Sequence, residues 1–381
     1  MSMSARLAAE LRGDRVVWAI LILLGLFSIL AVYSATGTLA YRERGGNTES
    51  YLFKHTIILI AGLVITYFAH LVHYKRYMNW APILLPIAGI LLFYTLFMGA
   101  EINEARRWIV LPIIGISFQT SDFAKLALIL FVAKAITSKQ EYIKDFKSAF
   151  LPIIVPIVII CGLIAPADLS TAVILFITSF LMMFVGRVDL KYLGLLLLSG
   201  AFMFAFLILL GRSFPDYVRV TTWENRIQEF YAPSPDGDDT YQIDQAKIAI
   251  ANGGWIGKGP GNSTQRNYLP YAHADFIYAI ICEEYGLIGG GALIVLYLLL
   301  FFRITRLVTK SSKAFGAMVS LGLSLLIVIQ AFFHIGINVN VLPVTGLTLP
   351  MISMGGTSIL FTCIAFGIIL SASKYIESVA E

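Results

Sequence analysis

The residues best suited to chemistry lie between Gly253 and Gly290, where a polar, glycine-rich loop runs into a long apolar segment. Asp275 stands at the boundary between the two, and the loop before it carries Lys258 and Arg266. A carboxylate can act as a general base when a substrate proton lies within hydrogen-bond reach. A carboxylate at the edge of hydrocarbon, beside a cationic loop, is the most chemically suggestive arrangement in this chain.

Asp275 and the two glutamates that follow it also have simple structural explanations. Aspartate at a helix start accepts backbone N–H bonds and meets the positive end of the helix dipole, so capping is the favoured interpretation of Asp275 alone. Glu283 and Glu284 lie about 12 Å deeper along the same helix. Charges at that depth normally face a protein interior or a water-filled cavity. Ion pairs within the bundle would explain both glutamates, and Lys125 is a candidate partner.

A second group of candidates is cationic. Arg106, Arg107 and Trp108 are consecutive. They suit either an anchor in the headgroup layer or a clamp for phosphate, for which arginine offers a planar, bidentate fork. Lys125 follows Asp122 by one helical turn, so an ion pair between them competes with a phosphate contact.

Three further positions have two interpretations each. The loop GGWIGKGPGNS around Lys258 lacks the Ser or Thr of a P-loop, so it is either a flexible hinge or a nest of N–H groups for an anion. Asp168 either caps the helix that follows it or belongs to the same polar site. The five histidines show no metal-ligand spacing, and of them only His273 adjoins Asp275.

The composition places the chain in a membrane. It has 381 residues, of which 58% are hydrophobic and only 13% are charged. Soluble domains carry roughly 25% charged residues, so this surface belongs in a bilayer. The net charge of +5 comes from Lys and Arg that mostly flank apolar runs, which indicates membrane topology and not nucleic-acid binding.

Ten segments approach the roughly 20 apolar residues that a spanning helix needs. The sequence therefore predicts an all-α polytopic membrane protein, one integral membrane domain over residues 1–381, with spans at 16–35, 53–73, 81–100, 120–136, 150–165, 170–186, 192–211, 275–302, 315–338 and 357–373. Lys and Arg gather in alternate loops, so both termini are expected in the cytoplasm. The longest loop, 213–274, then faces outward and is expected to contain short amphipathic helices.

Several motifs along the whole chain resemble those of the SEDS family (shape, elongation, division and sporulation), the membrane glycosyltransferases of bacterial wall synthesis. They are ARRWI at 105–109, SDFAKLALIL at 121–130, PADLSTA at 166–172, YQIDQAKIAIANGGWIGKGPGNSTQRNYLPYAHADFIYAIICEEYGLIGG at 241–290 and LPVTGLTLPMISMGGTS at 342–358. Asp122, Thr120, Ala274 and Met354 depart mildly from the usual family residues. The last motif and the EEYG turn are more similar to the division-type FtsW branch than to the elongation-type RodA branch.

The resemblance implies a ten-helix fold that polymerises lipid II into glycan strands on the outer face, with undecaprenyl pyrophosphate leaving. The family's essential aspartate corresponds to Asp275, which makes it the expected general base. Arg107, Lys125, Lys258 and Arg266 are expected to hold the pyrophosphate, with a divalent cation, Mg²⁺ or Mn²⁺, as a further helper. The other substrate-binding candidates are Arg106, Trp108, Asp168, His273, Glu283, Glu284 and Ser353.

The resemblance also implies partners and a location. Besides lipid II and the growing lipid-linked glycan, the chain is expected to meet a class B penicillin-binding protein and other membrane proteins of the division machinery, in the bacterial cytoplasmic membrane at the septum. No nucleic acid is expected. Two other functions stay open: a lipid II flippase, which charges inside helices favour, and a scaffold whose partner holds the activity.

Overall fold

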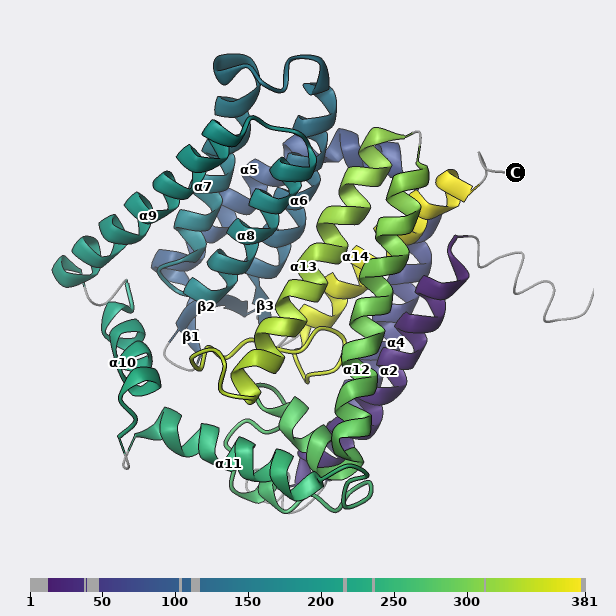
Figure 1. Cartoon of the computed structure of the whole chain (residues 1–381), viewed down its shortest axis with the longest axis vertical. Coiled ribbons are helices and arrows are strands. Elements are labelled where there is room, and N and C mark those ends of the chain that lie inside the picture. The colour runs from purple at the N-terminus through teal and green to yellow at the C-terminus, as the bar shows by residue number, and fades with distance from the viewer. Residues whose placement is uncertain are drawn as a thin grey trace, which may run out of the picture.

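The computed structural model describes residues 13–37, 39, 48–102, 105–110, 117–214, 218–234, 237–311 and 313–377, without the side chains of 101–106, 376 and 377. Ten helices in these residues coincide with the ten predicted spans, which confirms the all-α membrane fold (Figure 1). They are α2 (Arg15–Ala35), α4 (Thr48–Leu71), α5 (Tyr74–Met98), α6 (Thr120–Ser138), α7 (Leu151–Ile164), α8 (Leu169–Val185), α9 (Leu190–Ser213), α12 (Ile277–Lys310), α13 (Ala314–Asn338) and α14 (Thr357–Glu377).

Eight membrane-spanning candidates among the described residues are long and apolar enough to cross a bilayer. The other two helices are α8, with 17 residues, and α6, which carries Asp122, Lys125 and Lys134. The predicted ends differ most at α12, which runs to Lys310 and not to 302, and at α5, which begins at Tyr74 and not at 81. The ring of His73 accepts a hydrogen bond from the Lys75 N–H and so starts the helix within a polar stretch.

The bundle buries its helices unequally. α13 and α14 are mostly buried, whereas α4, α5 and α9 expose large apolar side chains over most of their length. Exposed apolar faces of this extent suit contact with lipid. Buried polar side chains, which could form a functional site, lie instead along α12 and α13 and in the loops at their ends.

A small sheet interrupts the helical pattern between α5 and α6. Strands β1 (Ala100–Ile102), β2 (Ala105–Val110) and β3 (Ser117–Gln119) pair in order, antiparallel, with Trp108 opposite Gln119. The sequence prediction had treated this stretch as an irregular loop. Its backbone pairing holds the ARRWI motif in a fixed strand above the end of the bundle.

The long loop contains the two expected short helices, α10 (Val220–Tyr231) and α11 (Asp238–Gly253). α11 packs along the end of α12, and α10 lies near the end of α9 (Figure 1). The sheet, α10, α11 and the loop before α14 all lie at one end of the bundle (Figure 1). The segments predicted to face outward are thus brought together at a common end.

The α12 helix is interrupted within its first three turns, and the preceding loop forms hydrogen bonds with the backbone groups at the interruption. Gly286 adopts φ 66° and ψ −172°, which no helix permits. Residues 254–259 lie against the break: the Leu287 N–H donates to the Gly254 oxygen at 2.9 Å, and the Lys258 N–H donates to the Glu283 oxygen at 3.0 Å. Loop and helix therefore share one set of backbone hydrogen bonds, which keeps these buried groups satisfied.

Candidate active site

Asp275 lies in the turn that leads into α12, and it does not cap the helix. The N-cap position belongs to Phe276, and no side chain makes a capping hydrogen bond there. The Asp275 backbone N–H donates to the Tyr271 oxygen at 3.0 Å, while its carboxylate makes no hydrogen bond or ion pair within the described part of the chain. The capping interpretation is therefore wrong, and the carboxylate remains available for another task.

The loop between α13 and α14 closes over this turn. Gly346, at φ 71°, lies so close that a Cβ built there would be 3.6 Å from the Asp275 Oδ2. The Ser353 hydroxyl donates to the Ala274 oxygen at 2.7 Å, and the Met354 N–H donates to the His273 oxygen at 3.0 Å. Ser353 and His273 thus lie at the turn, and these contacts hold its backbone, so a contact of either residue with substrate stays a prediction.

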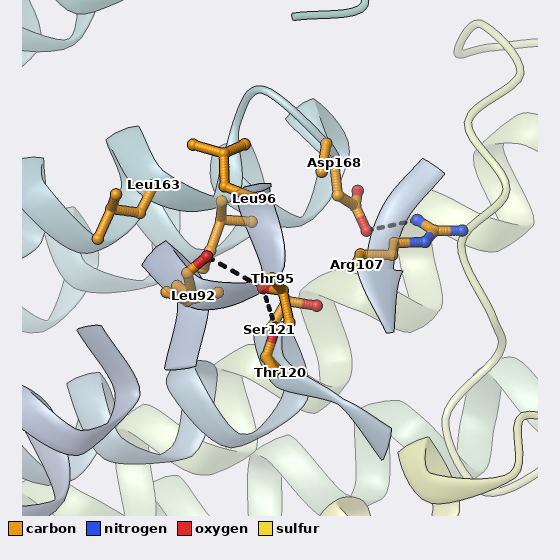
Figure 2. A pocket seen from close by; sticks show the side chains of 10 residues that line it. Leu92, Thr95, Leu96, Arg107, Thr120, Ser121, Leu163 and Asp168 are labelled. Atoms are coloured by element: carbon orange, nitrogen blue, oxygen red, sulfur yellow. Dashed lines mark hydrogen bonds and ion pairs between the residues drawn. The ribbon is translucent and has the colours of Figure 1, made fainter. Parts of the chain in front are cut away.

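Arg107 and Asp168 form an ion pair beside the turn. The Arg107 Nη1 donates to the Asp168 Oδ2 at 2.8 Å, joining β2 to the first turn of α8 (Figure 2). The Asp168 Oδ1 also accepts from the Thr171 N–H at 3.0 Å, so both interpretations of Asp168 hold at once. The pair lines a small pocket of mixed character, in which the hydroxyls of Thr95, Thr120 and Ser121 alternate with apolar side chains such as Leu92, Leu96 and Leu163 (Figure 2).

The surroundings of Asp275 change its acidity. Burial raises the pKa of the carboxyl to about 6, Arg107 and Arg226 lower it, and Asp168 raises it. Desolvation disfavours the charged form of a carboxyl, and nearby charges act according to their sign. A carboxylate whose pKa lies within two units of neutral pH is well matched to general-base catalysis. Arg226, on α10, was not among the predicted site residues.

In the ARRWI motif, the structure describes the side chains of Arg107 and Trp108 and leaves that of Arg106 undescribed. Trp108 lies in β2, and its indole N–H has no hydrogen-bond partner among the described residues. The Arg107 Nε is unpartnered in the same sense, so the guanidinium keeps a donor beyond its bond to Asp168. The side chain of Arg106 lies outside the described residues, and its expected role stays a prediction.

Lys125 is held inside the bundle. Its ammonium lies 2.8 Å from the Asp122 carboxylate and donates to the Gln330 Oε1 at 3.2 Å. The ion pair is the interpretation that the structure supports for Lys125. It is not the partner of the glutamates on α12, and its predicted contact with pyrophosphate remains a prediction.

Glu283 pairs with Lys258, not with Lys125. The Lys258 Nζ lies 2.7 Å from the Glu283 Oε1, and the carboxylate also accepts from the hydroxyls of Ser263 and Thr264 and from the Gln265 N–H. Glu283 is fully buried, so this set of donors replaces the water that the charge has lost. The glycine-rich loop is thereby fixed to α12 by its own lysine.

Glu284 and Arg266 tie the same loop to α2. The Ser34 hydroxyl donates to the Glu284 Oε1, and the Arg266 Nη1 donates to the Ser34 backbone oxygen and hydroxyl at 3.1 Å each. The Ser263 N–H also donates to Glu284 at 3.2 Å. These residues brace the loop, and the expected contact of Arg266 with pyrophosphate remains a prediction.

Three polar residues on α13 belong to the site although sequence reasoning did not select them. Gln330, His334 and Asn338 recur every four residues and all are buried. The Asn338 Nδ2 donates to the Asp275 backbone oxygen at 3.1 Å. Their spacing, which puts three polar groups on one face of an apolar helix, was the signal that could have found them.

No group of three or more His, Cys, Asp or Glu side chains in the described residues is placed to hold a metal ion. Mg²⁺ commonly uses one or two carboxylates and completes its shell with water and substrate phosphates. The described side chains could therefore hold a cation only together with ligands from the substrate.

Comparisons with known proteins agree with the geometry. A family model described as "Cell cycle protein" (FtsW, RodA and SpoVE) matches residues 14–378. The chain is 34% identical over 368 residues to "Probable peptidoglycan glycosyltransferase FtsW" of Geobacter metallireducens, covering 95% of each chain. It is 33% identical over 376 residues to stage V sporulation protein E of Bacillus subtilis, covering 95% of this chain and 97% of that one.

A solved structure shares the fold. A chain from a peptidoglycan synthase complex, described for its coordination of polymerization and crosslinking, superposes with a TM-score of 0.71 at 25% identity. The match covers 95% of this chain and 98% of the other. The match of the family model over nearly the whole length means that this chain belongs to the FtsW, RodA and SpoVE family, the SEDS proteins of bacterial wall synthesis.

Proposed function

We propose that this chain is a peptidoglycan glycosyltransferase that polymerises lipid II, with Asp275 as its general base. One observation carries the assignment of the base: the Asp275 carboxylate is partly buried and lacks a partner in the described residues, with a pKa raised to about 6. Relatives of this chain are named for the same activity. A long isoprenoid chain keeps such a substrate in the bilayer, which suits a site at the end of the bundle.

The proposed reaction joins two sugars. The 4-hydroxyl of the acceptor sugar attacks the anomeric carbon of the lipid-linked donor, and its proton passes to the Asp275 carboxylate. The new glycosidic C–O bond forms as the bond from the anomeric carbon to the pyrophosphate oxygen breaks. Undecaprenyl pyrophosphate leaves with the electron pair of that bond.

The leaving pyrophosphate needs cationic stabilisation. Arg107 is the favoured donor because it acts electrostatically on Asp275 and keeps an unpartnered Nε among the described residues. Lys258 and Lys125 are weaker candidates, since each already pairs with a buried carboxylate. Mg²⁺ or Mn²⁺, if held by the substrate phosphates, would neutralise further charge on the pyrophosphate.

The direct experiment is polymerisation of purified lipid II by the purified chain. Asp275→Asn should bind lipid II and yield no glycan, because the amide cannot accept the proton. Asp244→Asn is the matched control: this aspartate is exposed on α11, 2.7 Å from Lys247. Normal polymer from Asp275→Asn would overturn the assignment. Parallel reactions with chelator, Mg²⁺ or Mn²⁺ test the metal.

We also propose that the chain works with a class B penicillin-binding protein at the division septum, together with other division-machinery membrane proteins. A related chain sits in a complex that couples polymerization with crosslinking, which supports a transpeptidase partner. The test is co-purification from a division-synchronised culture and polymer yield with a catalytically inactive partner. Polymer formed under those conditions assigns the activity to this chain and excludes a scaffold role.

No specific observation favours the flippase alternative. It rested on charges within helices, and Lys125 and Glu283 are paired with Asp122 and Lys258. Paired charges of this kind also suit structural support. Lipid translocation in liposomes that persists in Asp275→Asn, without polymer from the wild type, would reverse this preference.

A further inference from the structure

Gln330, His334 and Asn338 form a row on one face of α13, which we call the polar row. The three residues lie four positions apart, span about 12 Å of helix and are at most 6% exposed. Polar groups buried among apolar side chains cost free energy unless they are hydrogen-bonded. The hydrogen-bond partners of the polar row therefore indicate what these three residues do in the fold.

The donors of the polar row end on the two backbone segments that enclose the site. The Gln330 Nε2 donates to the Thr348 oxygen at 2.9 Å, and the His334 Nδ1 donates to the Leu347 oxygen at 2.7 Å. A carbonyl can only accept, so the hydrogen of this contact lies on Nδ1. The Asn338 Nδ2 donates to the Asp275 oxygen at 3.1 Å. Helix, loop and turn are thus fixed to one another.

Asn338 holds both ends of the segment from Asp275 to Ala279. Its Oδ1 accepts from the Ala279 N–H at 3.1 Å, in the first turn of α12, while its Nδ2 holds Asp275 itself. An amide side chain that donates to Asp275 and accepts from Ala279 fixes the path of the backbone between these two residues. The direction of the Asp275 carboxylate depends on that path.

The inner end of the row rests on charged residues. The Gln330 Oε1 accepts from the Lys125 ammonium at 3.2 Å, and Lys125 pairs with Asp122 at 2.8 Å. The amide orientation of Gln330 is therefore fixed, because its oxygen faces the cation and its nitrogen faces Thr348. This contact gives Lys125 a supporting role that requires no substrate.

We infer that Asn338, His334 and Gln330 are positioning residues that aim the Asp275 carboxylate at the acceptor hydroxyl. The inference rests on the proposed function. Misplacing a catalytic group by about 1 Å can cost on the order of 100-fold in rate. Loss of an Asn338 or His334 contact should therefore lower kcat while the lipid II site, and hence KM, stays nearly unchanged.

The test compares four variants in the full-length chain with purified lipid II. Asn338→Leu removes the contacts to Asp275 and Ala279, and His334→Leu removes the donor to Leu347. His334→Asn keeps a donor close to the position of Nδ1. Ser324→Ala is the matched control, because Ser324 is buried in the same helix and, among the described residues, its hydroxyl donates only to the Leu321 oxygen of its own turn, at 2.9 Å.

The expected result is a loss of about 10- to 100-fold in kcat for Asn338→Leu and His334→Leu, with KM within about threefold of wild type. His334→Asn should recover most of the rate, and Ser324→Ala should match the wild type. Rates are normalised to folded protein by size-exclusion chromatography. If Asn338→Leu does not fold, the two His334 variants decide the question.

Different results would contradict the positioning role and the proposed function. Wild-type kcat in both leucine variants, or equal rates in His334→Leu and His334→Asn, would overturn the positioning role. If Asp275→Asn is inactive in the same assays, the proposed function survives that result. A wild-type protein that makes no polymer would instead overturn the proposed function.

Discussion

The acidity of Asp275 gives a quantitative prediction for the pH dependence of the reaction. The proposed base is the ionised carboxylate, and with a pKa of about 6 only about a tenth of the molecules carry it at pH 5. An aspartate at its ordinary value would be about nine-tenths ionised at that pH. We therefore expect kcat/KM for lipid II to fall roughly tenfold from its plateau at pH 5.

Two neighbouring charges should shift this profile in opposite directions. Arg107 lowers the pKa of Asp275, so Arg107→Gln should move the acid limb to higher pH. Asp168 raises the pKa of Asp275, so Asp168→Asn should move the limb to lower pH. Lys191→Gln is the control, because Lys191 pairs with Asp189 at 3.6 Å in a connection remote in sequence from the site.

The assay is initial-rate polymerisation of lipid II between pH 4.5 and 8.5, with each variant checked for folding at the extremes. An acid limb near pH 4 in the wild type would refute the raised pKa. Shifts of the same sign in Arg107→Gln and Asp168→Asn would refute the electrostatic origin. Plateau rates are compared separately, since Arg107 is also expected to stabilise the leaving group.

Three stability predictions follow from described contacts. Because the folded pKa of Asp275 is raised to about 6, ionisation of its carboxyl destabilises the fold as the pH rises through that value, and no such cost is present below about pH 4. Asp275→Asn should therefore be about 3 kcal/mol more stable than wild type at pH 8 and nearly equal at pH 4, measured by thermal melting. Lys258→Met leaves the buried Glu283 charge without its cation and should cost about 1–3 kcal/mol; unchanged melting would mean that the hydroxyl and N–H donors suffice. Gly286→Ala places a Cβ 2.2 Å from the Trp255 oxygen at positive φ and should cost more than about 1 kcal/mol, whereas Gly291→Ala, with nothing within 4 Å, should not lower the melting temperature.

The sequence predicts the helices well because each requires a long apolar run, and a bilayer admits few alternatives to a helix. It predicts helix ends less well where polar residues continue a helix, as at Tyr74. The strands β1–β3 were missed because short strands of 3 to 6 residues leave little periodicity to detect.

The sequence identified the charged residues of the candidate site but not the residues with which they form ion pairs. Asp275, Arg107 and Asp168 stood out because charges are rare in this chain, and the structure brings them within electrostatic reach. Lys125 was a candidate partner for Glu283 and Glu284, but the preceding loop lies against the break at Gly286 and brings Lys258 to Glu283. Pairings over such sequence distances depend on tertiary packing, which local patterns do not contain.

The closure of the Asp275 turn by the loop between α13 and α14 has a consequence for synthesis of the protein. The Ser353 hydroxyl donates to the oxygen of Ala274, which lies 79 positions earlier in the chain. At about 5–20 residues per second, a ribosome needs roughly 4–16 s to add that stretch. Throughout that interval the Asp275 turn lacks the contacts of this loop. A nascent or truncated chain therefore cannot hold the proposed base in place, and we expect activity only when α13, the loop and α14 are complete.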